Sequence, residues 1–103
     1  MMRKRITIEI PSKLRYCIED GEKTSTMFKR VLKDVDKDII VILDFRKTTY
    51  IDSSGLGILL WLRNWLGDES KIVLVNISNY VWKILRMANF QILFNFDFED
   101  KHV

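Results

Sequence analysis

The residues best suited to chemistry lie in one short segment, Asp52 to Gly57, which reads Asp-Ser-Ser-Gly-Leu-Gly. This segment falls where a loop meets a predicted helix. The first turn of a helix has backbone N–H groups without an intrahelical partner and the positive end of the helix dipole, so it attracts anions. A serine hydroxyl there caps the helix, and a phosphorylated serine would hold a charge of about −1.5 to −2 beside the same N–H groups.

The two glycines of the segment, Gly55 and Gly57, have two interpretations. Because they have no side chains, they leave the surface over the first helical turn low, so that a partner could approach the serines closely. Alternatively, they allow the helix to pack closely against a sheet, and Asp52 and Ser53 are only helix caps. The spacing of these residues leaves both interpretations open.

The first half of the chain predicts strands and a helix around this segment. Apolar and polar residues alternate from Ile6 to Ile10, which predicts a half-buried strand stopped by Pro11. Residues 14–18 are a candidate second strand. Apolar residues at helical spacing predict a helix over Thr24–Val35, capped by Thr24 or Ser25. The unbroken apolar run Ile39–Leu43 is typical of a strand buried on both faces.

The second half predicts the other parts of an α/β fold. Leu56–Leu66 is long enough to be the crossover helix between Ile39–Leu43 and a second buried run, Ile72–Val75. Ser78 can cap a further helix, which Asn89 would end in a left-handed conformation. Alternating residues over 92–98 predict a last strand. The expected fold is a mixed sheet of about four to five strands with helices packed against it, in a single domain of residues 1–103.

Composition narrows the classes of function. The net charge is +3, but basic residues are interleaved with acidic ones outside Arg3–Arg5, so we expect no nucleic-acid partner. Cys17 is the only cysteine, which excludes an intramolecular disulfide and a cysteine-cluster metal site. We expect no metal and no cofactor. Apolar stretches fall short of the roughly 20 residues of a membrane helix and no secretory signal stands out, so we expect a cytoplasmic protein without membrane insertion.

The segment Asp52–Gly57, followed by three apolar residues and preceded by a buried strand, closely resembles the signature of STAS domains. The resemblance is greatest to bacterial anti-sigma factor antagonists, and it extends from Ile39 to Phe94. It implies that a kinase-like anti-sigma factor phosphorylates Ser53, with Ser54 as the second choice. It also implies a partner-binding surface, which comprises Asp20, Asp52, Ser53, Ser54, Gly55, Leu56 and Gly57.

Two regions depart from the family's pattern. Residues 12–25 lack the usual Gly-Glu-Leu-Asp and Thr-Ala pattern and read Cys-Ile-Glu-Asp-Gly at 17–21, so the partner surface near Asp20 differs. The crossover helix has Trp61, Leu62 and Trp65 where polar residues are common. Its apolar side chains cover well over half of its circumference, so they serve either the core or an interface.

The resemblance implies a two-state binding switch rather than an enzyme. The chain would bind an anti-sigma factor with serine kinase activity while Ser53 is unphosphorylated and release it when phosphorylated, and a serine phosphatase would restore binding. Enzyme chemistry is disfavoured because His102 is the only histidine, near the C-terminus, and a Gly-x-Ser-x-Gly elbow is absent. We expect the chain alone to be monomeric, although the edge strand Ile6–Ile10 could pair with another chain.

Two alternatives remain open. The first is a STAS subunit that docks on a transporter ATPase or another regulatory complex without phosphorylation. The second is a small enzyme or nucleotide-binding protein that holds phosphate at the helix N-terminus, although no lysine follows Gly55-Leu56-Gly57 as in a phosphate-binding loop.

Overall fold

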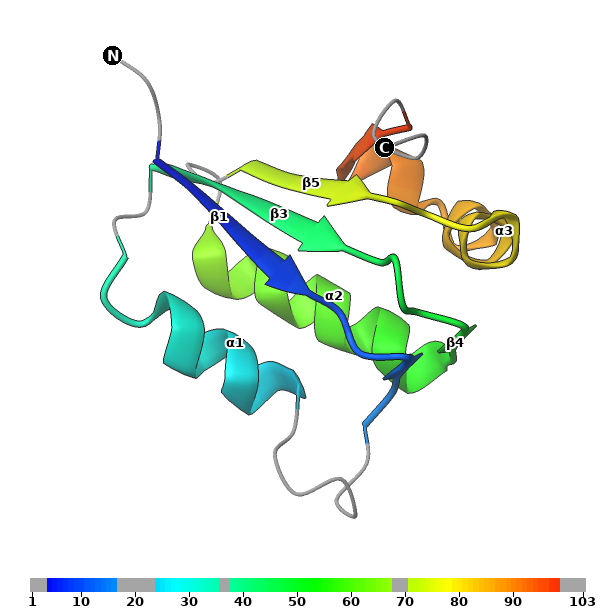
Figure 1. The fold of residues 1–103 in the computed structure, drawn as a ribbon, viewed down its shortest axis with the longest axis horizontal. Helices are drawn as coiled ribbons and strands as arrows, with labels where there is room; N and C mark the ends of the chain where they lie inside the picture. Colours follow the sequence, from blue (N-terminus) through cyan, green and yellow to red (C-terminus); the bar gives the residue numbers. More distant parts are fainter. Residues whose placement is uncertain (1–3, 17–23, 36–37, 68–70, 99–103) are drawn as a thin grey trace.

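The computed structural model describes residues 4–16, 24–35, 38–67 and 71–98, and Figure 1 shows how their elements are arranged. The main sheet has the strand order β1-β3-β5-β6, and β2 pairs with β4 in a small second sheet. The strands are β1 (Lys4–Glu9), β2 (Lys13–Leu14), β3 (Ile39–Asp44), β4 (Tyr50–Ile51), β5 (Lys71–Val75) and β6 (Asn95–Asp97). The helices are α1 (Thr24–Leu32), α2 (Ser53–Leu66), α3 (Asn79–Met87) and the short 3-10 helix η2 (Phe90–Ile92).

Every strand pairing in both sheets is parallel. The main sheet grows in one direction, because α1 connects β1 to β3, α2 connects β3 to β5, and α3 connects β5 to β6. Crossovers between parallel strands are right-handed, so a sheet that grows in one direction receives its helices on one face. Accordingly, side chains of all three helices, such as Phe28, Leu59 and Val81, share one apolar core with that face.

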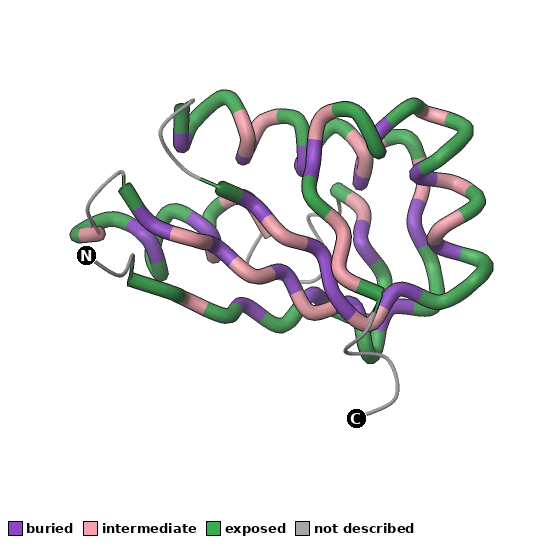
Figure 2. The backbone as a smooth tube through the Cα atoms, turned by 90° about the horizontal axis from the view of Figure 1, so that it is seen from above, coloured by how far each residue is buried: buried purple, intermediate pink, exposed green. Residues whose placement is uncertain are grey.

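The expected α/β class is confirmed, but the sheet differs from the prediction in several respects. The strands are parallel throughout rather than mixed, since each crossover returns the chain to the same end of the sheet. The run Ile39–Leu43 is fully buried on one face only: burial alternates along β3, as the colours of the strands in Figure 2 show. A two-residue strand, β4, precedes Asp52 and was not expected from the sequence.

The expected last strand begins too early. The side chain of Ile92 is 77% exposed, and Phe90–Ile92 forms a 3-10 helix instead. The left-handed conformation of Asn89 (φ 60°) turns the chain, and the N–H groups of Leu93 and Phe94 then donate to the carbonyl of Phe90, both at 3.0 Å. Hydrogen bonds of this kind close a helical turn and delay the strand to residue 95.

The other predicted elements agree with the structure, with different bounds. The strand expected over 14–18 overlaps β2 at Leu14, and residues 17 and 18 lie outside the described residues. Helix α1 ends at Leu32 rather than Val35, and α2 begins at Ser53, three residues before the apolar run that predicts it. Ser78 caps α3 by accepting a hydrogen bond from the N–H of Val81 at 3.2 Å, as expected.

The many apolar side chains of α2 lie partly in the core and partly at the surface. The partly buried Trp61 packs against the core and stacks on Trp65, with ring centroids 5.4 Å apart, while Trp65 is 39% exposed. The ammonium of Lys29, on α1, lies 5.5 Å from the centroid of Trp61. In the part of the chain that the structure describes, none of the helices combines the length and the apolar character needed to span a bilayer.

Candidate functional site

The start of α2 is positioned by the small sheet of β2 and β4. The carbonyl of Ser12 accepts hydrogen bonds from the N–H groups of Thr49 (2.8 Å) and Tyr50 (3.2 Å). The buried Thr48 donates its hydroxyl to the carbonyl of Pro11 at 2.9 Å. These bonds join the segment after β1 to the segment after β3, and so hold the chain in place just before Asp52.

Asp52 is the N-cap of α2, which is one of the roles that the sequence left open for it, whereas Ser53 is the first helical residue and not the cap. Its backbone is extended (φ −122°), and its Oδ1 accepts hydrogen bonds from the N–H of Gly55 (3.0 Å) and the hydroxyl of Ser54 (2.6 Å). The hydroxyl of Tyr50 donates to Oδ2 at 3.2 Å. The hydrogen bond from Ser54, followed by that from the Gly55 N–H, lowers the pKa of Asp52, since each stabilises the ionised carboxylate.

The two candidate serines differ in their surroundings. Ser53, the first residue of α2, is exposed. Ser54 is partly buried, and its hydroxyl donates to Asp52 while its Oγ accepts a hydrogen bond from the N–H of Tyr16 at 2.9 Å. The Ser54 hydroxyl is therefore engaged in holding the chain near β2 against the helix, whereas Ser53 faces solvent.

The structure separates the two interpretations of the glycines. Gly55 is buried, and a Cβ there would collide with the carbonyl group of Leu14 and lie 3.1 Å from Cγ1 of Ile51. Gly57 is exposed, and a Cβ there would have no atom within 4 Å. Close packing therefore explains Gly55, and an open surface describes Gly57. Leu56, between them, is partly buried and packs against the core.

Aromatic side chains surround this helix start. We call Tyr16, Tyr50 and Tyr80 the tyrosine rim; their side chains are 50%, 37% and 50% exposed. The guanidinium of Arg15 lies 6.0 Å from the centroid of the Tyr50 ring. The charge of Asp52, and the hydrogen bond that Tyr50 donates to it, raise the pKa of Tyr50, and Tyr80 adds to this effect.

Most of this rim could not be predicted from the sequence, because Tyr16 follows β2, Tyr50 lies in β4 and Tyr80 lies in α3. A tyrosine two residues before the capping aspartate was the one local signal. Asp20, expected beside the motif, lies outside the described residues. Asp52 and the residues up to Gly57 lie together at the start of α2, but Gly55 is buried there and does not contribute to an exposed surface.

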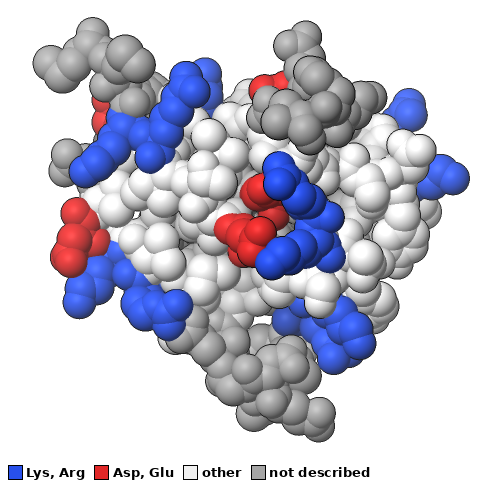
Figure 3. Space-filling view, viewed as in Figure 1, with Lys and Arg blue, Asp and Glu red and all other residues white. Residues whose placement is uncertain are grey.

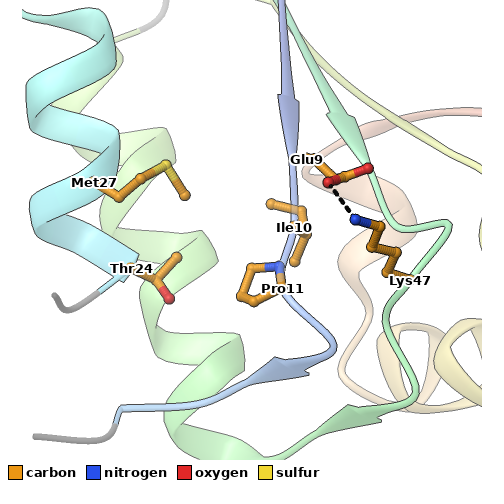
Figure 4. A pocket seen from close by; sticks show the side chains of 6 residues that line it. All are labelled: Glu9, Ile10, Pro11, Thr24, Met27 and Lys47. Atoms are coloured by element: carbon orange, nitrogen blue, oxygen red, sulfur yellow. Dashed lines mark ion pairs between the residues drawn. The ribbon is translucent and has the colours of Figure 1, made fainter. Parts of the chain in front are cut away.

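A pocket of about 310 Å³ lies elsewhere, between the start of α1 and the end of β1 (Figure 4). Glu9 and Lys47 form an ion pair of 3.1 Å at one side, and both side chains are more than half exposed. Met27 and Thr24 line the other side. None of the residues from Asp52 to Gly57 lines this pocket. Among residues 4–16, 24–35, 38–67 and 71–98, no three His, Cys, Asp or Glu side chains are grouped so as to hold a metal.

Comparisons with known proteins agree with the fold and the motif. The family model of the STAS domain matches residues 20–102. A STAS-domain containing protein of Pseudomonas aeruginosa (strain UCBPP-PA14) is 50% identical over 54 residues, which are 52% of this chain and 54% of that protein. The chain thus matches about half the length of this curated relative.

The fold also resembles a solved structure. The crystal structure of a sulfate transporter family protein from Wolinella succinogenes superposes with a TM-score of 0.68 and 22% sequence identity, covering 94% of this chain and 80% of that one. At this identity the likeness concerns the fold alone. Because the family model spans most of the sequence, the chain belongs to the STAS domain family.

Proposed function

We propose that the chain is a binding switch of the anti-sigma factor antagonist type, controlled by phosphorylation of Ser53. Its partner would be an anti-sigma factor with serine kinase activity, bound while Ser53 is unphosphorylated. The observation that supports this proposal is the contrast between the serines: Ser53 is exposed, whereas Ser54 is engaged by Asp52 and Tyr16. A kinase needs a hydroxyl that it can reach, and Ser53 offers one without disturbing the cap.

The Asp52 cap explains why a phosphate would oppose docking. The carboxylate already accepts the Gly55 N–H, so a phosphate on Ser53 would not find that donor free. The lowered pKa keeps Asp52 ionised, and the phosphate would add about −1.5 to −2 beside it. Like-charge repulsion and desolvation would then act against a partner. A loss of roughly 3–4 kcal/mol would weaken binding several-hundred-fold.

The same cap argues against the phosphate-cradle alternative. A cradle for a free phosphate needs N–H groups at the helix start that are not already used. Here the N–H of Gly55 is bonded to Asp52, and Asp52 itself presents a negative charge to any incoming anion. A binding switch for a protein partner fits this arrangement better than a small-molecule site.

The tyrosine rim gives the proposed interface its contact area. Tyrosine and arginine are enriched at the centres of protein interfaces, where their rings and guanidinium groups fill pockets on the partner. Tyr16, Tyr50 and Tyr80 are exposed around the cap, and Arg15 lies against Tyr50. Exposed Gly57 leaves room above the first turns of α2 for a partner to approach.

The test is an affinity pull-down from the native lysate with mass-spectrometric identification. The baits are the wild type, Ser53→Ala, Ser53→Asp, and Asn64→Asp as a matched control. Asn64 is exposed on the same helix, eleven residues or roughly 16 Å further along, so this control adds the same charge away from the cap. We expect an anti-sigma factor with wild type, Ser53→Ala and Asn64→Asp, and its loss with Ser53→Asp.

Incubation of the chain with the recovered partner and ATP should then phosphorylate Ser53, and a serine phosphatase should restore binding. Recovery of one transporter ATPase or regulatory complex by all four baits would instead support the unphosphorylated docking subunit. Recovery of no anti-sigma factor by any bait would contradict the proposed partner.

A further inference from the structure

One face of the main sheet lies outside the core. Paired strands place residues that are in register on the same face, so the parallel pairings define this outer face row by row. Its middle row is Thr7, Ile42, Val73 and Asn95. Ile42 and Val73, with Ile40 beside them, are partly buried but are not among the apolar residues packed against the core.

The topology explains why the described helices leave this face uncovered. The main sheet grows in one direction, so its right-handed crossovers place α1, α2 and α3 on the other face. In Figure 1 strand β1 crosses in front of α2, and Figure 3, from the same side, shows a largely uncharged area on the strands. Parallel sheets are almost always covered on both faces, so a face with an isoleucine and valine centre that the described helices leave open is a candidate binding surface.

The two ends of this face carry side chains of opposite charge. The row at the start of the strands is basic, with Arg5 and Lys71 on either side of Ile40. The row at their end is acidic, with Glu9, Asp44 and Asp97 around Val75. Figure 3 shows basic side chains at the upper left and a mixed group near the centre, separated by the uncharged area.

We propose that a second copy of this chain covers the outer face. A two-fold axis in the plane of the interface and perpendicular to the strands would stack the two sheets with their strands antiparallel. The middle row of one copy would then lie on the middle row of the other, and each basic row would face an acidic row. On β1, Arg5 of one copy would face Glu9 of the second, with Thr7 at the axis.

The existing ion pair of Glu9 does not prevent this. Glu9 is paired with Lys47 at 3.1 Å, but both side chains are more than half exposed. Exposed pairs are worth about 0–1 kcal/mol, so the carboxylate can accept Arg5 of a second copy at little cost.

The small area of the face indicates a weak dimer. Four strands about 4.8 Å apart, with about five residues each at 3.3 Å, give roughly 300 Å² per copy. Stable dimers bury about 800 Å² per partner, so this association is transient and the chain is monomeric when dilute.

Sedimentation equilibrium of the full chain over a wide concentration range tests the proposal. The variants are Arg5→Glu, Glu9→Arg, the double swap, and Ile42→Lys, with Lys83→Glu on the exposed side of α3 as a matched charge control. We expect wild type and Lys83→Glu to dimerise alike. Each single swap should weaken the dimer by about tenfold and the double swap should restore it, because opposite charges again face each other.

Ile42→Lys separates the outer face from the other way in which Arg5 could meet Glu9, which is pairing of two β1 edges. A lysine at the centre of the face should abolish the dimer, whereas it would leave an edge-paired dimer intact. The proposal is overturned by a wild type that stays monomeric at millimolar concentration, by a dimer that survives Ile42→Lys, or by a double swap that does not recover.

Discussion

The backbone of Gly55 packs directly against the carbonyl group of Leu14. A Cβ at position 55 would collide with that carbonyl, and the oxygen belongs to the backbone of β2, which cannot rotate away as a side chain would. We therefore expect Gly55→Ala to lower the free energy of unfolding by about 2 kcal/mol, since overpacking costs about 1–3 kcal/mol and the gain in helix propensity offsets part of it. Urea unfolding followed by circular dichroism measures the change.

Gly57→Ala is the matched control for this prediction. It introduces the same methyl group into the same helix two residues later, where no atom lies within 4 Å. Only the propensity gain remains, so this variant should be more stable than the wild type by up to about 1 kcal/mol. Equal effects of the two substitutions would contradict the packing of Gly55 on β2.

The two serines should respond differently to alanine. Ser54→Ala removes a hydrogen bond from Tyr16 and one to Asp52, and we expect a loss of about 1–2 kcal/mol in the free energy of unfolding. Ser53→Ala, at an exposed position, should change it by no more than about 0.5 kcal/mol. Thermal unfolding of both variants makes the comparison, and a larger loss for Ser53→Ala would reverse the roles assigned to the serines.

Short local motifs identified candidate capping residues for α2 and α3, whereas contacts between residues far apart in the sequence could not be predicted. Asp52 and Ser78 cap helices a few residues away, so short motifs were enough to identify them. The hydrogen bond from the N–H of Tyr16 to Ser54 joins residues that are 38 positions apart, and no pattern within either segment predicts it. The tyrosine rim was hidden for the same reason.

The unbroken apolar run of β3 illustrates a different limit. Its composition suggests burial on both faces, yet Ile40 and Ile42 lie on the outer face. The order in which the strands join the sheet decides which face the helices cover, and the composition of a strand does not contain that order. The prediction that the last strand begins at residue 92 was wrong, because the alternation of apolar and polar residues also fits a 3-10 turn followed by a short strand.

The lowered pKa of Asp52 predicts loss of stability in acid. Because the folded-state pKa lies below the ordinary value of 3.8, the stabilisation is complete above that value and is lost as the pH falls through the folded-state pKa. Asp52→Asn keeps a capping oxygen without the charge. The wild type should thus be more stable than Asp52→Asn near neutral pH, and the difference should close in acid.

Urea unfolding at a series of pH values measures this difference. Ser54→Ala provides a control, because it removes the largest cause of the lowered pKa. In that variant the acid loss of stability should shift to higher pH. A gap between wild type and Asp52→Asn that stays constant down to the lowest pH would show that the charge of Asp52 is not linked to folding.

The raised pKa of Tyr50 can be observed without unfolding the protein. Its hydroxyl donates to the ionised Asp52, and a phenolate there would lie beside a carboxylate, so the proton is held more tightly than at the ordinary pKa of 10.0. Tyrosine ionisation changes the ultraviolet absorbance, and the part removed by Tyr50→Phe belongs to Tyr50. We expect its midpoint above 10.0 in the wild type and lower in Asp52→Asn.

Removal of Arg15 should shift the pKa of Tyr50 in the direction opposite to the shift expected for Asp52→Asn. The positive charge of Arg15 lowers the pKa of Tyr50, so Arg15→Ala should move the midpoint further up. Since the folded state holds the Tyr50 proton more tightly than the unfolded state, the associated stability is present below pH 10 and is lost as the pH rises through the folded-state pKa. An unchanged midpoint in both Asp52→Asn and Arg15→Ala would mean that Tyr50 points away from the cap in solution, and the tyrosine rim would lose its central member.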